Sequence, residues 1–420
     1  LFVCLLLLPV VVQCSRKSII FGSTSITLCA KVAEAHVSRG NVRSLGVIAK
    51  SMASYAYQTP LRDKAADVLK LLISKIHTLY SSETTAETRR DVDSWLNNFQ
   101  MTKEAWEMSH KVLVMQDVAG SGVDDQVLYF AANTLHKKSR QDVTDLNVSD
   151  LDALRHSLMS LIIQSNKKNI QNRLCLAYAA LCAHRYGLKP NEYPLKEVFN
   201  FFFDKTANAV DQQKYLCAGV ELFTVLLEEA TTDFLPISED VRDIFVARIR
   251  IHADGVLIFL SKCLQMEIQE PQRIFTCFKS WIKYGEITPT QLAASPMIKA
   301  CFAHISAETI IEILRCYNRL STDAPVIQAM IPLVMSLSAN INSSDQAHEI
   351  ARIMTSMGES YMHIICGSEN IGQENLVAVL CSCVQHNDTE IAKVALPFWE
   401  DLKYYLVDRV KRFEAIDDGT

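Results

Sequence analysis

The sequence predicts an all-α protein, specifically a right-handed α-solenoid of antiparallel helix pairs. Gly and Pro number only 13 and 11 in 420 residues, about half of their average usage, which disfavours turn-rich β architectures. Apolar residues recur at helical spacing in successive runs, and each run ends in a polar or Gly/Pro break after roughly ten to twenty residues. The chain is also too long for one ordinary core, so a repeat array or about two to three domains are expected.

The first 65 residues lack the paired-helix pattern and are assigned as a leader. Residues 1–14, LFVCLLLLPVVVQC, form an apolar run of signal-peptide length without an initiator Met or a basic flank, and the run is too short to span a bilayer as a helix. A secreted or membrane-anchored protein is one interpretation of this run. We favour a mispredicted or truncated start.

Residues 66–150 form the next predicted domain. Between Asp91 and Lys138 the sequence predicts three short helices, with a Gly-containing break at 120–125 before the last of them. Aromatic residues stand at helical spacing along this stretch, and we interpret them as packing residues without chemistry. They are Trp95, Phe99, Trp106 and Phe130.

Residues 151–407 continue the helical pattern and 408–420 form a tail. One central residue from every second predicted helix gives the series Trp95, Phe130, Ala177, Phe223, Trp281, Leu314, Met354 and Trp399. Their mean spacing of about 43 residues lies within the roughly 40 to 47 expected for HEAT or armadillo (ARM) repeats. Stacked helix pairs of this type expose an extended surface, so the array is predicted to bind partners.

Charge and motif content exclude several function classes. Lys and Arg number 42 against 47 Asp and Glu, with no run of five basic residues, so no direct nucleic-acid binding is expected. No phosphate-binding, dinucleotide-binding, zinc-protease or serine-hydrolase motif occurs, and we predict neither an enzyme, nor a cofactor, nor a metal site. Most of the 13 cysteines lie in apolar runs and are interpreted as buried free thiols of a reducing compartment. Seven of them are Cys175, Cys182, Cys217, Cys263, Cys277, Cys301 and Cys316.

The order of short motifs in the 66–150 domain resembles the amino-terminal domain of importin-β-type (karyopherin-β) nuclear transport receptors. The matching residues are Trp95-Leu96, Phe99-Gln100, Ala105-Trp106, Tyr129-Phe130-Ala131-Ala132 and Lys137-Lys138. The segment from Asp150 to Arg185 is similar to the exportin-like part that follows in this family. Later helices, around residues 221–230, 274–287 and 398–399, resemble the transportin-3 and importin-13 branch. The resemblance covers about 67–407, and the receptors continue through many more repeats, so we interpret the chain as an amino-terminal fragment.

This resemblance implies a nuclear import receptor that shuttles between cytoplasm and nucleus. Such receptors bind Ran-GTP through the inner helices of their first repeats and bind Phe-Gly nucleoporins on outer grooves. They carry protein cargo largely on later repeats, and for this branch the expected cargo is Arg/Ser-rich splicing factors. No membrane partner is implied. The residues expected to contact Ran are Asp125, Gln126, Tyr129, Asn133 and Lys137.

One alternative comes from a different class. Generic HEAT-repeat scaffolds, which organise other proteins without a role in nuclear transport, share the paired-helix pattern. They have no reason to share the motif order between Thr88 and Lys138, and this order favours the transport receptor.

Overall fold

The computed structural model describes residues 59–115, 122–190, 193, 195–205, 212–266, 270–341, 345–367 and 373–417. The regular structure of these residues is helical, without a strand. The predicted all-α solenoid of helix pairs is confirmed. No helix in these ranges is long and apolar enough to cross a membrane. The apolar run 1–14 lies outside the described residues.

The chain divides into two compact units, residues 1–96 and 97–420. The first unit contains α4 (Thr59–Tyr80) and most of α5 (Ala86–Gln100). Leu72 and Ile76 of α4 and Val92 and Leu96 of α5 are buried. In both helices the buried residues stand four apart, as expected for one apolar face of an amphipathic helix.

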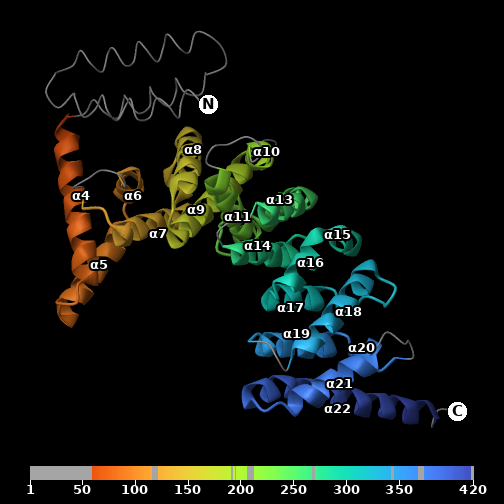
Figure 1. Cartoon of the computed structure of the whole chain (residues 1–420). Helices are drawn as coiled ribbons and strands as arrows, with labels where there is room; N and C mark the ends of the chain where they lie inside the picture. Colours follow the sequence, from red (N-terminus) through yellow and green to blue (C-terminus); the bar gives the residue numbers. More distant parts are fainter. Residues whose placement is uncertain are drawn as a thin grey trace. The chain divides into compact units, whose positions relative to one another are not determined.

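In the second unit the helices form two rows. The first row contains α6 (Glu104–Val114), α8 (Val148–Gln164), α10 (Lys196–Lys205), α12 (Glu239–Arg250), α13 (Ala253–Gln265), α15 (Pro289–Ala294), α16 (Pro296–Ala303), α18 (Pro325–Leu337), α20 (Met362–Ile365) and α21 (Gln373–Val384). The second row contains α7 (Asp125–Gln141), α9 (Lys168–Leu188), α11 (Gln212–Ala230), α14 (Pro271–Tyr284), α17 (Ala307–Cys316), α19 (Ala347–Ser360) and α22 (Thr389–Asp417). Each second-row helix packs on the next one along the chain (Figure 1).

Helix starts follow from local sequence. Asp124 accepts hydrogen bonds from the backbone N–H groups of Gln126 and Val127 and so caps α7, and Thr288 forms a capping box with Gln291 at the start of α15. Such caps satisfy N–H groups that have no partner within the helix. Pro occupies the first position of four helices, α14, α15, α16 and α18, where its missing N–H costs nothing.

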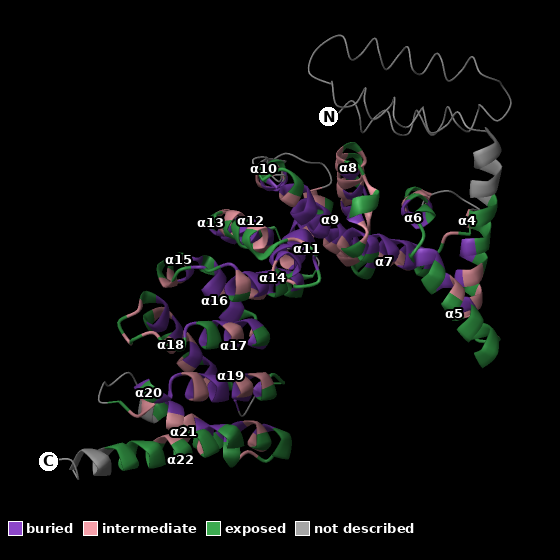
Figure 2. Ribbon diagram, turned by 180° about the vertical axis from the view of Figure 1, so that it is seen from behind, coloured by how far each residue is buried: buried purple, intermediate pink, exposed green. Residues whose placement is uncertain are grey.

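The repeat predicted from the anchor series is present in the second unit. Phe130, Ala177, Phe223, Trp281, Leu314, Met354 and Trp399 each lie in a different second-row helix. All of these are buried except Trp399, which is half-buried. Buried residues are concentrated in the middle of the second row, whereas α22 is mostly exposed (Figure 2).

Hydrogen bonds also link successive repeats. The indole of Trp281 donates to the carbonyl of Phe223 at 2.9 Å. Tyr317 directly follows α17, and its buried phenol donates to the carbonyl of Ile287 in the preceding repeat at 2.6 Å. Tyr361 directly follows α19, and its buried phenol donates in the same way to the carbonyl of Tyr317 at 3.2 Å. The two tyrosine bonds satisfy carbonyls that lie outside helices, and so they stabilise the junctions between repeats.

The cysteine prediction is correct for most positions and wrong at one. Five of the seven named cysteines are buried, Cys217 is half-buried, and Cys316 is exposed. Cys316 is the last residue of α17 and, with Arg315, lies on the side of the helix away from the buried Ile313, Leu314 and Tyr317. Burial raises the thiol pKa of Cys182 to about 11 and that of Cys263 to about 12, so these thiols stay protonated and unreactive at neutral pH.

Candidate partner-binding surface

The five residues predicted to contact Ran lie along one side of α7. Asp125, Gln126 and Lys137 are exposed, and Tyr129 and Asn133 are half-buried. Asp125, Tyr129, Asn133 and Lys137 stand four residues apart, so they follow one stripe of the helix surface. The opposite side of α7 faces the core. We call the five residues the α7 stripe.

The start of α9 borders the α7 stripe. Lys167 Nζ forms an ion pair with Asp125 Oδ2 at 2.9 Å, and the guanidinium of Arg173 lies 5.9 Å from the ring centre of Tyr129. Sequence reasoning did not include either basic residue in the surface. A signal for them existed, because each stands about one repeat length, roughly 43 residues, after its partner.

Lys137 and Lys138 have opposite environments. Lys137 Nζ donates to Gln100 Oε1 at 2.8 Å on the exposed side of α7. Lys138 is only 1% exposed. Its Nζ lies 2.7 Å from Asp142 Oδ2 and 5.5 Å from the ring centre of Trp106. Of these two lysines, only Lys137 is therefore available to a partner.

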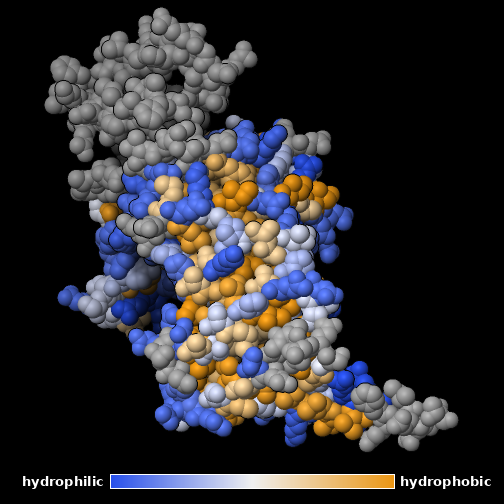
Figure 3. Space-filling model, turned by 45° about the vertical axis from the view of Figure 1, so that its right-hand side comes forward, coloured by the Kyte–Doolittle hydropathy of each residue, from blue (hydrophilic) through white to orange (hydrophobic). Residues whose placement is uncertain are grey.

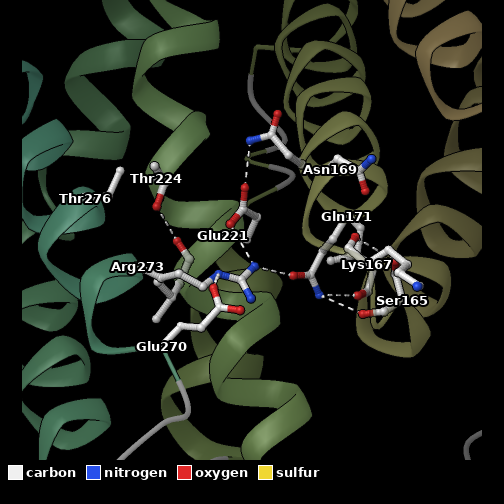
Figure 4. Close-up of polar contacts among 12 residues, drawn as sticks. Ser165, Lys167, Asn169, Gln171, Glu221, Thr224, Glu270, Arg273 and Thr276 are labelled. Carbon is white, nitrogen blue, oxygen red and sulfur yellow. Dashed lines mark hydrogen bonds and ion pairs between the residues drawn. The ribbon is translucent and has the colours of Figure 1, made fainter. Parts of the chain in front are cut away.

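A buried polar cluster joins three second-row helices beside this surface (Figure 4). Arg273 of α14 donates from Nη2 to Gln171 Oε1 of α9 at 2.7 Å and to Glu221 Oε2 of α11 at 2.8 Å. The other carboxylate oxygen of Glu221 accepts from Asn172 at 2.7 Å. Asn172 directly precedes Arg173, so this cluster and the contact to Tyr129 share one turn of α9.

A second cluster joins α7 to α11. Arg140 Nε donates to Glu229 Oε1 at 2.6 Å, and the same oxygen lies 3.4 Å from His136 Nε2. Burial alone would raise the pKa of Glu229, but the hydrogen bonds from Arg140 and His136 lower it below its usual value. Glu229 therefore stays ionised and ties α7 to α11 across α9.

A charged ladder continues along the exposed side of the later second-row helices. Glu308 of α17 pairs with Lys279 of α14 at 3.1 Å and also with Arg352 of α19. These hydrogen bonds, first that from Arg352, lower the pKa of Glu308. Exposed pairs of this kind contribute little to stability, about 0 to 1 kcal/mol, so the ladder mainly gives the surface a pattern of alternating charge.

Comparison with known proteins shows what the chain is similar to. Residues 167–317 match the family model of exportin 1-like proteins, and residues 342–415 match the second TPR domain of transportin-3 and importin-13. The chain is 26% identical to Transportin MOS14 of Arabidopsis thaliana over 76% of its length, and 26% identical to Importin-13 of Rattus norvegicus over 81%. The resemblance to the importin-β family, in its transportin-3 and importin-13 branch, is confirmed.

The importin-β resemblance covers most of this chain but only part of its relatives. The chain spans 34% of Transportin MOS14 and 36% of rat Importin-13. Among solved structures, the crystal structure of Kap121p bound to Nup53p aligns with 84% of this chain and 38% of that chain, at a TM-score of 0.42 and 12% identity. The exportin 1-like match begins at the start of α9 and ends just after α17. The relatives are transport receptors, not enzymes.

Proposed function

We propose that this chain acts in nuclear import, as a Ran-GTP-regulated carrier of protein cargo that shuttles through the nuclear pore between cytoplasm and nucleus. The observation that supports this most is the similarity to transportins and importins over about four-fifths of the chain. A HEAT-repeat scaffold unrelated to transport would give the same helix pairs but not this similarity.

Ran in its GTP state is proposed to bind the α7 stripe together with the start of α9. The stripe offers a carboxylate, two amides, a phenol and an ammonium group within one helix. Arg173 and Lys167 add positive charge at its border. Mixed polar surfaces of this kind favour specific and rapid association more than high affinity from burial.

Phe-Gly nucleoporins are proposed to bind an apolar groove in the later repeats. The groove is lined by Leu314, Ile327, Met330, Ile331, Met335, Met357, Tyr361, Ile364, Ile365 and Leu376. The free space between these side chains is about 20 Å³, so the groove's three methionines have to change rotamer to admit an aromatic ring. Apolar side chains gather down the face that carries α13, α15 and α18, with polar side chains along its edges (Figure 3).

Arg/Ser-rich splicing factors are the proposed cargo. The chain spans about a third of its relatives, and cargo in this family is expected largely on later repeats. We therefore expect the 420-residue chain to bind Ran-GTP but to bind an isolated Arg/Ser-rich domain only weakly. Tight binding of that domain would contradict this division of roles.

A pull-down with purified Ran tests the proposal. The chain is immobilised and offered Ran loaded with GTP or with GDP at equal concentration. We expect retention of the GTP form and little retention of the GDP form. Equal retention of the two forms, or retention of neither, would favour the scaffold.

A further inference from the structure

His136 of α7 lies between an arginine and a glutamate inside the stack of second-row helices. Its side chain is only 4% exposed, and both of its ring nitrogens face charged groups. Nε2 lies 3.4 Å from Glu229 Oε1 of α11, and Nδ1 lies 3.5 Å from Arg173 Nη1 of α9. The histidine therefore connects the border of the α7 stripe with the buried cluster that joins α7 to α11.

The two neighbours determine which nitrogen of His136 carries the proton. A guanidinium only donates hydrogen bonds, so Nδ1, which faces Arg173, has to be the unprotonated nitrogen. Glu229 is ionised at neutral pH, and an ionised carboxylate only accepts, so Nε2 carries the proton. The carboxylate is itself held by Arg140, whose Nε donates to it at 2.6 Å. These contacts fix the tautomer of the neutral ring and aim its lone pair at Arg173.

Arg173 is held between His136 and the α7 stripe. Its guanidinium lies 5.9 Å from the ring centre of Tyr129, a distance at which an aromatic ring attracts a cation. We propose that His136 is a positioning residue: its neutral ring holds Arg173 beside Tyr129, and proton uptake by the ring releases Arg173 and weakens Ran-GTP binding at the α7 stripe. This inference rests on the proposed Ran site and adds its regulation by acid.

The surroundings of His136 oppose a second proton on the ring. Burial is the largest effect, and it lowers the pKa of His136 below its ordinary value of 6.5. Arg140 and Arg173 lower this pKa further, whereas Glu229 raises it. The ring is therefore neutral in the folded chain at neutral pH and takes up a proton only as the pH falls below 6.5. A proton on Nδ1 would then face the N–H groups of Arg173, and two donors that face each other repel.

Other charged groups around α7 are engaged elsewhere. On α7 itself, Lys137 is bonded to Gln100 and Lys138 to Asp142. α6 and α9 pack on α7, and several of their charged or titratable groups have partners of their own. These pairs are Lys103 with Asp145, Lys111 with Glu107, His110 with Ser157 and Arg185 with Asp152. We therefore attribute an acid-dependent release of Arg173 to His136.

Ran-GTP binding at about pH 7.5 and about pH 5.5 tests this regulation. His136→Gln is the informative variant, because an amide also offers a donor and an acceptor but takes up no proton in this range. Relative to His136→Gln, the parent should lose at least about threefold in affinity at the lower pH. This comparison cancels any effect of acid on Ran itself. His110→Gln is the matched control, because it removes a half-buried histidine of α6 and should keep the pH dependence of the parent.

Two further measurements show whether His136 acts through Arg173. At neutral pH, His136→Leu should weaken Ran-GTP binding in the parent, but it should have no further effect once Arg173→Ala has removed its partner. Nitrogen NMR of labelled histidines follows the ring without Ran. The signal that His136→Gln removes should be that of a neutral ring with its proton on Nε2.

The outcomes separate this inference from the proposed Ran site. Absence of Ran-GTP binding by the parent at neutral pH would contradict the Ran site and the regulation that rests on it. Ran-GTP binding with the same pH dependence in the parent and in His136→Gln would leave the Ran site standing and overturn the role of His136. A neutral ring with its proton on Nδ1, or an effect of His136→Leu that persists with Arg173→Ala, would also overturn that role.

Discussion

Arg273 of α14 and Glu221 of α11 form a buried ion pair, with 2.8 Å between Nη2 and Oε2. Arg273 is 8% exposed and Glu221 5%. Two desolvated charges are held together only if their remaining hydrogen-bonding groups also find partners. Gln171 of α9 accepts from the guanidinium and Asn172 donates to the carboxylate, while Arg273 Nε has no hydrogen-bond partner among the described residues and lies 3.9 Å from Glu270 Oε2. The pair therefore fixes how three successive repeats pack.

Removing Arg273 alone should destabilise the second unit strongly. Arg273→Met leaves a buried carboxylate without its cation, which costs about 3 to 5 kcal/mol. Adding Glu221→Gln removes the stranded charge and should recover part of the loss. Urea unfolding of the single and double variants measures this coupling. A double variant whose loss equals the sum of the two single losses would show that the pair is not coupled.

Two glycines on second-row helices should respond oppositely to alanine. A Cβ on Gly219 would lie 2.7 Å from the ring of Phe259 and 2.9 Å from that of Phe202, so Gly219→Ala should overpack the core and cost about 1 to 3 kcal/mol. A Cβ on Gly187 would meet its nearest neighbour at 3.7 Å. Gly187→Ala should therefore be neutral or stabilise by up to about 1 kcal/mol. Thermal unfolding of both variants checks this, and equal effects would contradict the packing of α11.

The half-buried His110 should make stability depend on pH. Burial lowers the pKa of His110 below its ordinary value of 6.5, while in the unfolded chain the imidazole recovers that value. Its contribution to stability is complete above pH 6.5 and is lost as the pH falls, because only the unfolded chain then binds the proton. Between pH 7.5 and 5.5 the melting temperature of His110→Gln should fall less than that of the parent. Identical pH profiles would show that His110 is not buried in neutral form.

Phe-Gly binding should depend on the methionine-lined groove. Ile331 and Ile365 line it and are half-buried, so a carboxylate at either position puts a charge where the aromatic ring would sit. Ile331→Asp should weaken binding of a synthetic Phe-Gly repeat peptide at least about tenfold. Leu396→Asp is the control, because Leu396 is an exposed apolar residue of α22 outside the groove. Loss of binding in the control but not in Ile331→Asp would place the peptide elsewhere.

The helix pairs could be predicted because apolar periodicity encodes them directly. The burial of Lys138 could also have been predicted from helical spacing, because Lys138 stands four residues after Thr134 and eight after Phe130, and all three lie on the buried side of α7. The Arg273–Glu221 pair could not be predicted. Nothing in the local sequence distinguishes a charge that will be buried between repeats from one that will face water.

The site was predicted only in part. The α7 stripe follows from the sequence as one exposed side of a helix, but its border with α9 depends on how neighbouring repeats align.

Titration of the chain with Ran bound to a non-hydrolysable GTP analogue is the most direct test of the proposed Ran site. We expect saturable binding that is at least about tenfold tighter than with Ran-GDP. We also expect the binding to be weakened in a variant combining Gln126→Arg and Asn133→Arg, and to be unchanged by Gln272→Arg on the exposed start of α14. Equal affinity for the two nucleotide states, or an effect of Gln272→Arg without an effect of the α7 variant, would contradict the proposed site.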